Sequence, residues 1–152
     1  MESSAVDSPL VVDLDGTLVL TDTLQESIVR LIVKNPIYLF FLPVWIVLGK
    51  ATFKKKIAEK VQLNYELLPY DLLFVDFLRV EKNKGRKIIL ATGADQSIAK
   101  GVANALDLFD DVHATDGVNL VGKRKADLLV NKYGHNGFDY AGDSAIDLHI
   151  WA

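Results

Sequence analysis

The sequence contains no cysteine and is not basic overall, and both absences restrict what the protein can be. Without cysteine there is no disulfide framework and no thiolate chemistry, so we expect a reducing, cytosolic setting. The net charge of -3 excludes a strongly basic nucleic-acid-binding protein, and we expect no nucleic-acid partner. Half of the 152 residues are hydrophobic, which predicts one domain with a packed core, or a core with a small insertion.

A long hydrophobic run is also lacking. The most apolar stretch, residues 37–48, is twelve residues long and contains Pro43, whereas a membrane-spanning helix needs about 20 residues. The charges are unevenly distributed, because residues 30–60 contain seven basic side chains and one acid, which leaves a net charge of -9 on the rest. Such a basic segment is suited to a phosphate ester or a lipid surface; the alternative is a solvated basic helix face.

Two carboxylates follow the first predicted strand. Residues 10–12 are apolar, and Asp13, Asp15 and Gly16 come after them, as where a buried parallel strand ends in a tight turn. Because successive strand side chains alternate in direction, Asp13 and Asp15 point to the same side and can converge on one ligand. Such a pair can hold a hard cation, or one member can act as nucleophile while the other moves protons. The alternative is an ordinary Asp-Gly turn.

The next part of the chain is predicted to be helical. Thr23 is the expected N-cap of the first helix, in a capping-box pattern with Glu26. The second helix, residues 36–48, is apolar on every side and must be buried in protein, in a partner or in lipid headgroups. The run of lysines in the third helix, Lys54–Lys56, predicts a helix face that is exposed to solvent. The four expected helices cover residues 23–34, 36–48, 51–61 and 69–84.

The second half alternates between strands and helices. We expect a helix capped by Asp95 and another over residues 123–133, between strands over residues 87–91, 111–114 and 138–141. This order predicts an α/β fold with a doubly wound parallel sheet, in which ligands collect at the carboxyl ends of the strands. Thr92 and Asp143 follow two of these strands, and Asp147 comes one turn after the second.

Four short motifs, in this order, resemble those of the haloacid dehalogenase (HAD) superfamily of phosphatases. They are Asp13-Leu14-Asp15-Gly16-Thr17, Ala91-Thr92-Gly93, a lysine at the head of the helix from residue 123, and Gly142-Asp143-Ser144-Ala145-Ile146-Asp147. Together they cover almost the whole chain and are far more specific than any one alone. The resemblance implies a Rossmann-like, doubly wound core made of residues 1–19 and 84–152, with residues 20–83 inserted as a helical cap.

The resemblance also implies an enzyme, a magnesium-dependent phosphomonoester hydrolase. In this hypothesis Asp13 attacks phosphorus and forms an aspartyl phosphate, and Asp15 protonates the leaving oxygen. Asp15 must start protonated, and crowding by the carboxylates of Asp13 and Asp143 would raise its pKa. Magnesium would be held by Asp13, Asp143 and the main-chain carbonyl of Asp15.

The remaining motif residues would bind the phosphate group. Thr92 would donate its hydroxyl, Gly93 lies beside it, and a lysine would neutralise the charge on the phosphoryl oxygens. Lys125 fits the motif best, and Lys123 is the alternative. Asp147 would orient that lysine or a metal-bound water without binding the metal itself.

A closer resemblance is to the N-terminal HAD-like domain that precedes a UbiA-type polyprenyltransferase membrane domain in some bacterial proteins. It is carried by the first motif together with Asn35-Pro36, Leu68-Pro69-Tyr70 and the stretch from Gly137 to Ser144. We therefore expect a fragment of a longer protein with a C-terminal membrane domain, located in the cytoplasm at the inner face of the membrane. The alternative is a complete, minimal protein.

The substrate class and the function class remain open at this point. The basic, apolar cap favours a phosphorylated small molecule carried on a lipid or prenyl chain, held near a membrane. A signalling receiver domain is a second reading, but the two acids and Gly16-Thr17 lie together after the first strand, which counts against it. A third is a catalytically weak regulatory or docking domain for a membrane prenyltransferase, which would keep the same motifs.

Overall fold

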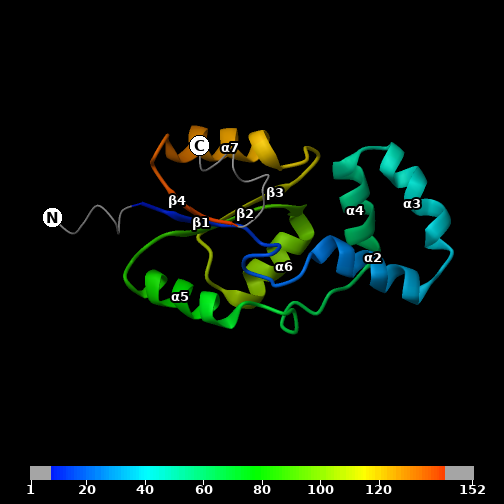
Figure 1. The fold of residues 1–152 in the computed structure, drawn as a ribbon, viewed down its shortest axis with the longest axis horizontal. Helices are drawn as coiled ribbons and strands as arrows, with labels where there is room; N and C mark the ends of the chain where they lie inside the picture. The colour runs from blue at the N-terminus through cyan, green and yellow to red at the C-terminus, as the bar shows by residue number, and fades with distance from the viewer. Residues whose placement is uncertain (1–7, 143–152) are drawn as a thin grey trace.

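The computed structural model describes residues 8–142, and its centre is a four-stranded parallel sheet (Figure 1). Val11 on the first strand pairs with Ile89 on one side and with Tyr140 on the other. The strands follow the order β3-β2-β1-β4 and are β1 (Leu10–Val12), β2 (Ile88–Asp95), β3 (Asp111–Thr115) and β4 (Asp139–Ala141). The predicted parallel α/β fold is therefore confirmed, although β2 continues past its predicted end at residue 91.

Helices cover both faces of this sheet. Helix α7 (Gly122–Tyr133) lies on one face, and helices α5 (Leu72–Asn83) and α6 (Gln96–Leu106) lie on the other (Figure 1). Alternate strand residues face opposite layers. Val11 packs in a cluster with Leu129 of α7, whereas Val12 belongs to the larger cluster that contains Leu78 of α5. This is the doubly wound layering that the strand and helix order predicted.

Three further helices form a separate unit beside the sheet. They are α2 (Thr23–Lys34), α3 (Tyr38–Val47) and α4 (Lys50–Lys60), and Figure 1 shows them away from both covered faces. The unit has its own small core, built around Leu31, Trp45 and Ile57. Helix α5, which the sequence assigns to the same 20–83 segment, instead packs on the sheet through Val75 and Leu78. The helices that stand apart from the sheet are therefore α2, α3 and α4.

Helix α3 is apolar but largely exposed. The sequence required it to be buried in protein, in a partner or in lipid, yet Trp45 is its one buried residue. Phe40 and Val47 have 80% and 85% of their surface exposed. The protein itself, over the residues that the structure describes, therefore does not supply the cover that this helix needs.

The segment before α5 is extended rather than helical at Pro69. The carbonyl of Pro69 accepts a hydrogen bond from the N–H of Leu20, 2.8 Å away, so this proline belongs to a loop that runs along the chain after β1. The helix begins at Leu72, where the carboxylate of Asp71 accepts from the N–H of Phe74 at 3.2 Å. The prediction that Pro69 starts the helix was wrong, because Asp71 provides the N-cap that proline lacks.

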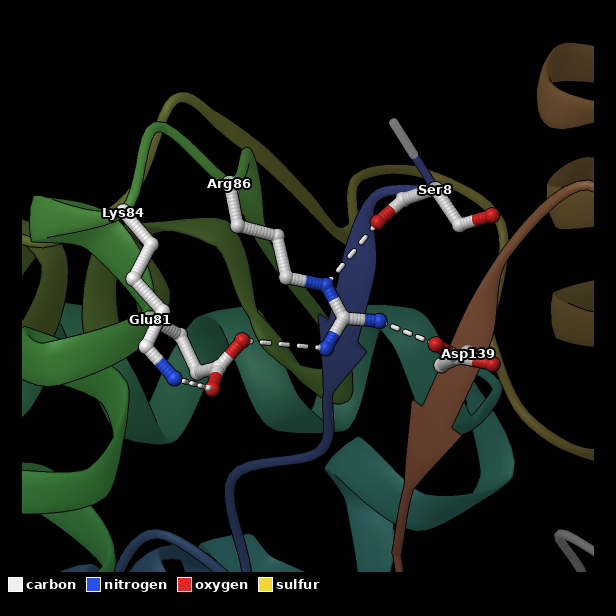
Figure 2. A network of polar contacts seen from close by, with 5 residues as sticks. All are labelled: Ser8, Glu81, Lys84, Arg86 and Asp139. Atoms are coloured by element: carbon white, nitrogen blue, oxygen red, sulfur yellow. Dashed lines mark hydrogen bonds and ion pairs between the residues drawn. The ribbon is translucent and has the colours of Figure 1, made fainter. Parts of the chain in front are cut away.

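Arg86 ties the amino ends of β1 and β4 to α5 (Figure 2). Its Nε donates to the carbonyl of Ser8 at 2.9 Å, and its two terminal nitrogens bind the carboxylates of Glu81 and Asp139. Lys84 adds an ion pair with Glu81 at 3.5 Å. This network lies at the opposite end of β1 from Asp13, so it fixes the strand that carries the two acids.

Candidate active site

Asp13 lies at the carboxyl end of β1, the strand between β2 and β4. Its backbone N–H donates to the carbonyl of Ala141 at 2.9 Å, which extends the pairing with β4 one residue past Val12. The residue is buried, with 8% of its surface exposed. A carboxylate in this position is held rigidly by the centre of the sheet and opens onto the space beyond the strand ends.

Lys125 is the basic group that faces Asp13. Its Nζ lies 3.0 Å from Oδ1 of Asp13 and 2.7 Å from the hydroxyl of Tyr140, and it sits 5.2 Å from the centre of the Tyr140 ring. Lys125 is 3% exposed, whereas Lys123 is exposed on the outer side of the same helix. Of the two lysines that the sequence left open, the structure therefore brings Lys125 to the acids.

Asp15 is held by the first turn of α2. The chain turns sharply at Gly16, whose φ of 74° is in the left-handed region that favours glycine. Oδ1 of Asp15 then accepts a hydrogen bond from the N–H of Thr23 at 2.8 Å. Thr23 was predicted to be the N-cap, which is wrong: Asp22 caps the helix by accepting from the N–H of Gln25 at 3.0 Å. Thr23 is instead the first helical residue, where the backbone N–H has no acceptor within the helix, and this N–H orients Asp15.

The pKa of Asp15 is raised above its usual value. Burial, which disfavours the charged form, is the largest cause, and the nearby carboxylate of Asp22 adds to it. The hydrogen bonding from Thr23 and the charge of Lys54 act in the opposite direction but do not cancel the effect. The direction agrees with the sequence expectation, but its main cause is burial rather than a neighbouring carboxylate.

Thr92 and Gly93 lie on β2, beside the end of β1. Thr92 is buried, and its hydroxyl oxygen accepts from the N–H of Ala94 at 3.0 Å; because a hydroxyl also donates, it can still offer its hydrogen to an anion. Gly93 has no room for a side chain. A Cβ there would lie 2.4 Å from Cγ1 of Val121 and 3.3 Å from the carbonyl oxygen of Leu120. The close approach of these two segments requires glycine at this position.

Lys54 is a residue of the site that the sequence reasoning missed. It was expected on a solvated face, but its Nζ donates to the carbonyl of Gly93 and to Oδ1 of Asn119, both at 2.6 Å. Burial lowers the pKa of Lys54, and the negative charge of Asp15 opposes that shift. The ammonium group of Lys54 thus joins the separate helical unit to the carboxyl end of β2 and to the loop before α7.

These side chains line a cavity of about 430 Å³ between the sheet and helices α2 and α4. Its charged and polar wall contains Asp13, Asp15, Lys54, Lys125 and Thr92. The rest of the wall is mostly apolar and includes Leu20, Leu24, Ile98, Leu120 and Val121. The cavity therefore offers a charged floor for an anion and an apolar wall for whatever the anion is attached to.

A metal site is only partly represented in the described residues. Asp13 and Asp15 supply oxygen atoms of the kind that Mg²⁺ prefers, so the donor chemistry fits. No group of three or more histidine or acidic side chains within residues 8–142 is arranged so that it could hold a metal ion. Asp143, the third predicted ligand, and Asp147 lie outside the described residues. In the sequence, Asp143 comes two residues after Ala141, with which Val12 pairs.

No family model matches the sequence. The uncharacterized protein y4nM of Sinorhizobium fredii (strain NBRC 101917 / NGR234) is 37% identical over 145 residues, which is 94% of this chain. The chain spans 28% of the length of that relative.

Solved structures show the same fold at low sequence identity. A HAD family hydrolase from Salmonella enterica subsp. enterica serovar Typhi matches with a TM-score of 0.67 and 14% identity, over 94% of this chain and 60% of that one. A predicted phosphoglycolate phosphatase from Haemophilus somnus 129PT matches with a TM-score of 0.62 and 16% identity, over 95% of this chain and 80% of that one. The chain therefore has the α/β fold of the HAD hydrolases.

Proposed function

We propose that the protein is a phosphomonoester hydrolase that works through an aspartyl phosphate on Asp13. The observation that carries the proposal is the buried pair of Asp13 and Lys125, 3.0 Å apart at the floor of the cavity, with Asp15 beside it. A nucleophile, a cation for the phosphoryl oxygens and a proton donor are the three groups that this displacement requires.

Asp13 is the proposed nucleophile. Its carboxylate oxygen would form the bond to phosphorus as the bond to the leaving oxygen breaks, and water would then cleave the acyl phosphate. Lys125 is already in contact with that carboxylate, so it is placed to stabilise the negative charge of the phosphoryl oxygens. Thr92 and Gly93 would bind the same phosphate group from β2.

Asp15 is the proposed general acid and base. It would give its proton to the leaving oxygen and later take a proton from the attacking water. The raised pKa supports this role, because it increases the fraction of Asp15 that is protonated at the start of the reaction. The hydrogen bond from the N–H of Thr23 fixes the direction of the carboxyl group.

We propose Mg²⁺ as the cofactor, held by the carboxylates of Asp13 and Asp143 and by the main-chain carbonyl of Asp15. When bound, the ion would orient the phosphate group and neutralise part of its charge. Asp147 would orient Lys125 or a metal-bound water. The ligand proposal has a readout that does not depend on turnover: Mg²⁺ should raise the melting temperature of the protein, and Asp143→Asn should abolish that increase.

We propose that helices α2 to α4 act as the cap and that the substrate is a phosphate on a lipid or prenyl carrier. The apolar residues Leu24, Ile98 and Leu120 in the cavity wall suit a hydrocarbon chain. The solved structure that matches with 80% of its own length is a predicted phosphoglycolate phosphatase, which makes a small phosphorylated acid the competing substrate class.

We also propose that the protein acts at the cytoplasmic face of a membrane and is related to domains that precede UbiA-type prenyltransferases. The relative y4nM, of which this chain spans 28%, leaves room for such a second domain in that protein. A regulatory or docking domain for a membrane prenyltransferase is the alternative function, and it predicts an intact site without turnover.

A screen of soluble and lipid-linked phosphate esters with Mg²⁺ tests the proposal. Asp13→Asn should lower turnover of an accepted ester roughly 10³-fold or more, because it removes the nucleophile. Asp127→Asn, which changes an exposed acid on α7, is the matched control and should keep full turnover. Rapid quenching followed by mass spectrometry should find the phosphoryl group on Asp13. Turnover that survives Asp13→Asn refutes the mechanism, and no turnover of any ester supports the docking alternative.

A further inference from the structure

The outer face of α3 and its two flanking residues form an apolar surface, which we call the α3 patch. Its members are spaced at i, i+3, i+7, i+10 and i+11, the spacing that places side chains on one side of a helix. All five have more than half of their surface exposed; they are Ile37, Phe40, Val44, Val47 and Leu48. An unpartnered surface of this kind on a folded protein indicates an interaction site.

The cap does not need this patch for its own packing. The opposite side of α3 already packs in the cap's core, where Trp45 is buried and Tyr38 and Leu42 lie against the same cluster. A helix that only had to fold onto α2 and α4 would carry polar residues on its outer side. The packing of α3 in the core of its own unit therefore does not explain why its outer side is apolar.

Exposed basic side chains lie on α2 and α4, the two helices that contact α3, and we call them the basic rim. They are Arg30, Lys34, Lys50, Lys55 and Lys60. The acids on these two helices are Glu26, which pairs with Arg30 at 3.5 Å, and Glu59, so the five basic side chains outnumber the acids. Lys54, by contrast, is directed into the cavity and does not belong to the rim.

From these two observations we propose that the α3 patch and its basic rim bind the surface of an anionic lipid membrane. Apolar side chains can enter the boundary between headgroups and acyl chains while lysines attract the anionic headgroups. A second copy of the chain suits the patch less well, because a symmetric contact would bring two positive rims together. A partner protein would need a matching acidic rim.

The binding would be peripheral. Helix α3 has ten residues, about 15 Å at 1.5 Å per residue, which is half the thickness of the hydrocarbon layer. Within residues 8–142, no helix has the length and apolar character needed to cross a membrane. The proposed contact therefore places α3 along the interface rather than through it. This inference does not depend on the proposed phosphatase chemistry, since binding is measured without turnover.

Vesicle co-sedimentation of the whole chain tests the proposal. Vesicles of phosphatidylcholine with about one quarter phosphatidylserine should bind the protein at about 50 mM salt, and binding should weaken at about 500 mM salt as the charges are screened. Vesicles of phosphatidylcholine alone should bind it less. No binding to the anionic vesicles at low salt would overturn the proposal.

Two pairs of variants locate the contact. Phe40→Asp with Val47→Asp should weaken vesicle binding at least about tenfold, because two inserted apolar side chains are replaced by acids. Leu72→Asp with Leu73→Asp is the matched control, since these residues are 72% and 84% exposed on α5, and it should bind like the unchanged protein. Lys55→Glu with Lys60→Glu should reduce the dependence of binding on salt.

Two other outcomes count against the proposal. If Phe40→Asp with Val47→Asp keeps its native circular dichroism and still binds vesicles, another surface is responsible. If sedimentation velocity finds a dimer of the unchanged protein that these two substitutions dissociate, and vesicles do not bind, the patch is an interface between copies.

Discussion

The Nζ of Lys125 lies 3.0 Å from Oδ1 of Asp13, although 112 residues separate them in the sequence. Both side chains are nearly inaccessible to solvent, so the pair joins the end of β1 to the first turns of α7 in a low-dielectric setting. This pair is at once an element of stability and the centre of the proposed reaction.

We expect Lys125→Met to affect both properties. Removal of one partner of a buried ion pair should lower the free energy of unfolding by about 3 kcal/mol, because a charge stays behind in the interior. Turnover of an accepted phosphate ester should fall by about 100-fold or more. Urea denaturation and steady-state kinetics measure the two effects. Lys123→Met is the matched control and should stay within about 0.5 kcal/mol. A stable, fully active Lys125→Met variant would remove Lys125 from the mechanism.

Sequence periodicity could predict that Lys125 points toward the sheet, but not that its ammonium contacts Asp13. Lys125 and Leu129 are four residues apart on α7, and Leu129 packs against the sheet, so a lysine at this spacing must also point inward. Lys123 lies on the other side of the same helix. The parallel sheet was similarly predictable, because apolar runs ending in Gly or Asp alternate with helical patterns.

The position of Lys54 was harder to predict. It precedes the buried Ile57 by three residues and so lies on the inner side of α4, but the two residues that follow it are also lysines, and such a run is typical of a solvated face. Its bonds to Gly93 and Asn119 depend on how the separate helical unit sits against the sheet. Local propensity carries no information about that long-range arrangement.

We expect Lys54→Met to loosen the contact between the unit of helices α2–α4 and the sheet. The substitution keeps the side chain's apolar stem but removes the hydrogen bonds from α4 to Gly93 of β2 and to Asn119 in the loop before α7, which should cost about 1–3 kcal/mol. Amide hydrogen exchange in α4 should therefore become faster in this variant.

Lys55→Met is the control for that experiment, because Lys55 is exposed on the same helix. Its exchange rates in α4 should match those of the unchanged protein. Equal rates for Lys54→Met and Lys55→Met would show that the ammonium of Lys54 does not hold the unit of helices α2–α4 in place.

Arg86 should contribute more to stability than Arg30, the exposed arginine of α2. Arg86 is 10% exposed and binds Ser8, Glu81 and Asp139, so we expect Arg86→Met to lower the free energy of unfolding by about 2–3 kcal/mol. Arg30 pairs with Glu26 at 3.5 Å on the surface of α2, and Arg30→Met should cost less than about 0.5 kcal/mol. Urea denaturation checks both values. Similar losses for both variants would contradict the importance given to the Figure 2 network.

His113 should make the stability depend on pH. Its Nε2 lies 3.0 Å from the hydroxyl of Tyr133, and burial lowers the pKa of His113 below its usual 6.5. The charge of Lys132 adds to this shift, whereas Asp111, whose Oδ2 is 3.4 Å away, opposes it. Protonation is thus less favourable in the folded protein than in the unfolded chain.

The direction follows from proton binding. As the pH falls through 6.5, the unfolded chain takes up a proton before folded His113 does, so the free energy of unfolding should decrease until the pH reaches the lower, folded pKa. Urea denaturation between about pH 7.5 and 5.5 should show this decrease, and the window lies above the range in which Asp111 titrates. His113→Gln keeps a polar side chain of similar size but has no titrating group. The free energy of unfolding of this variant should therefore fall less over the same pH window. An equal or steeper decrease in His113→Gln would show that another group causes the pH dependence.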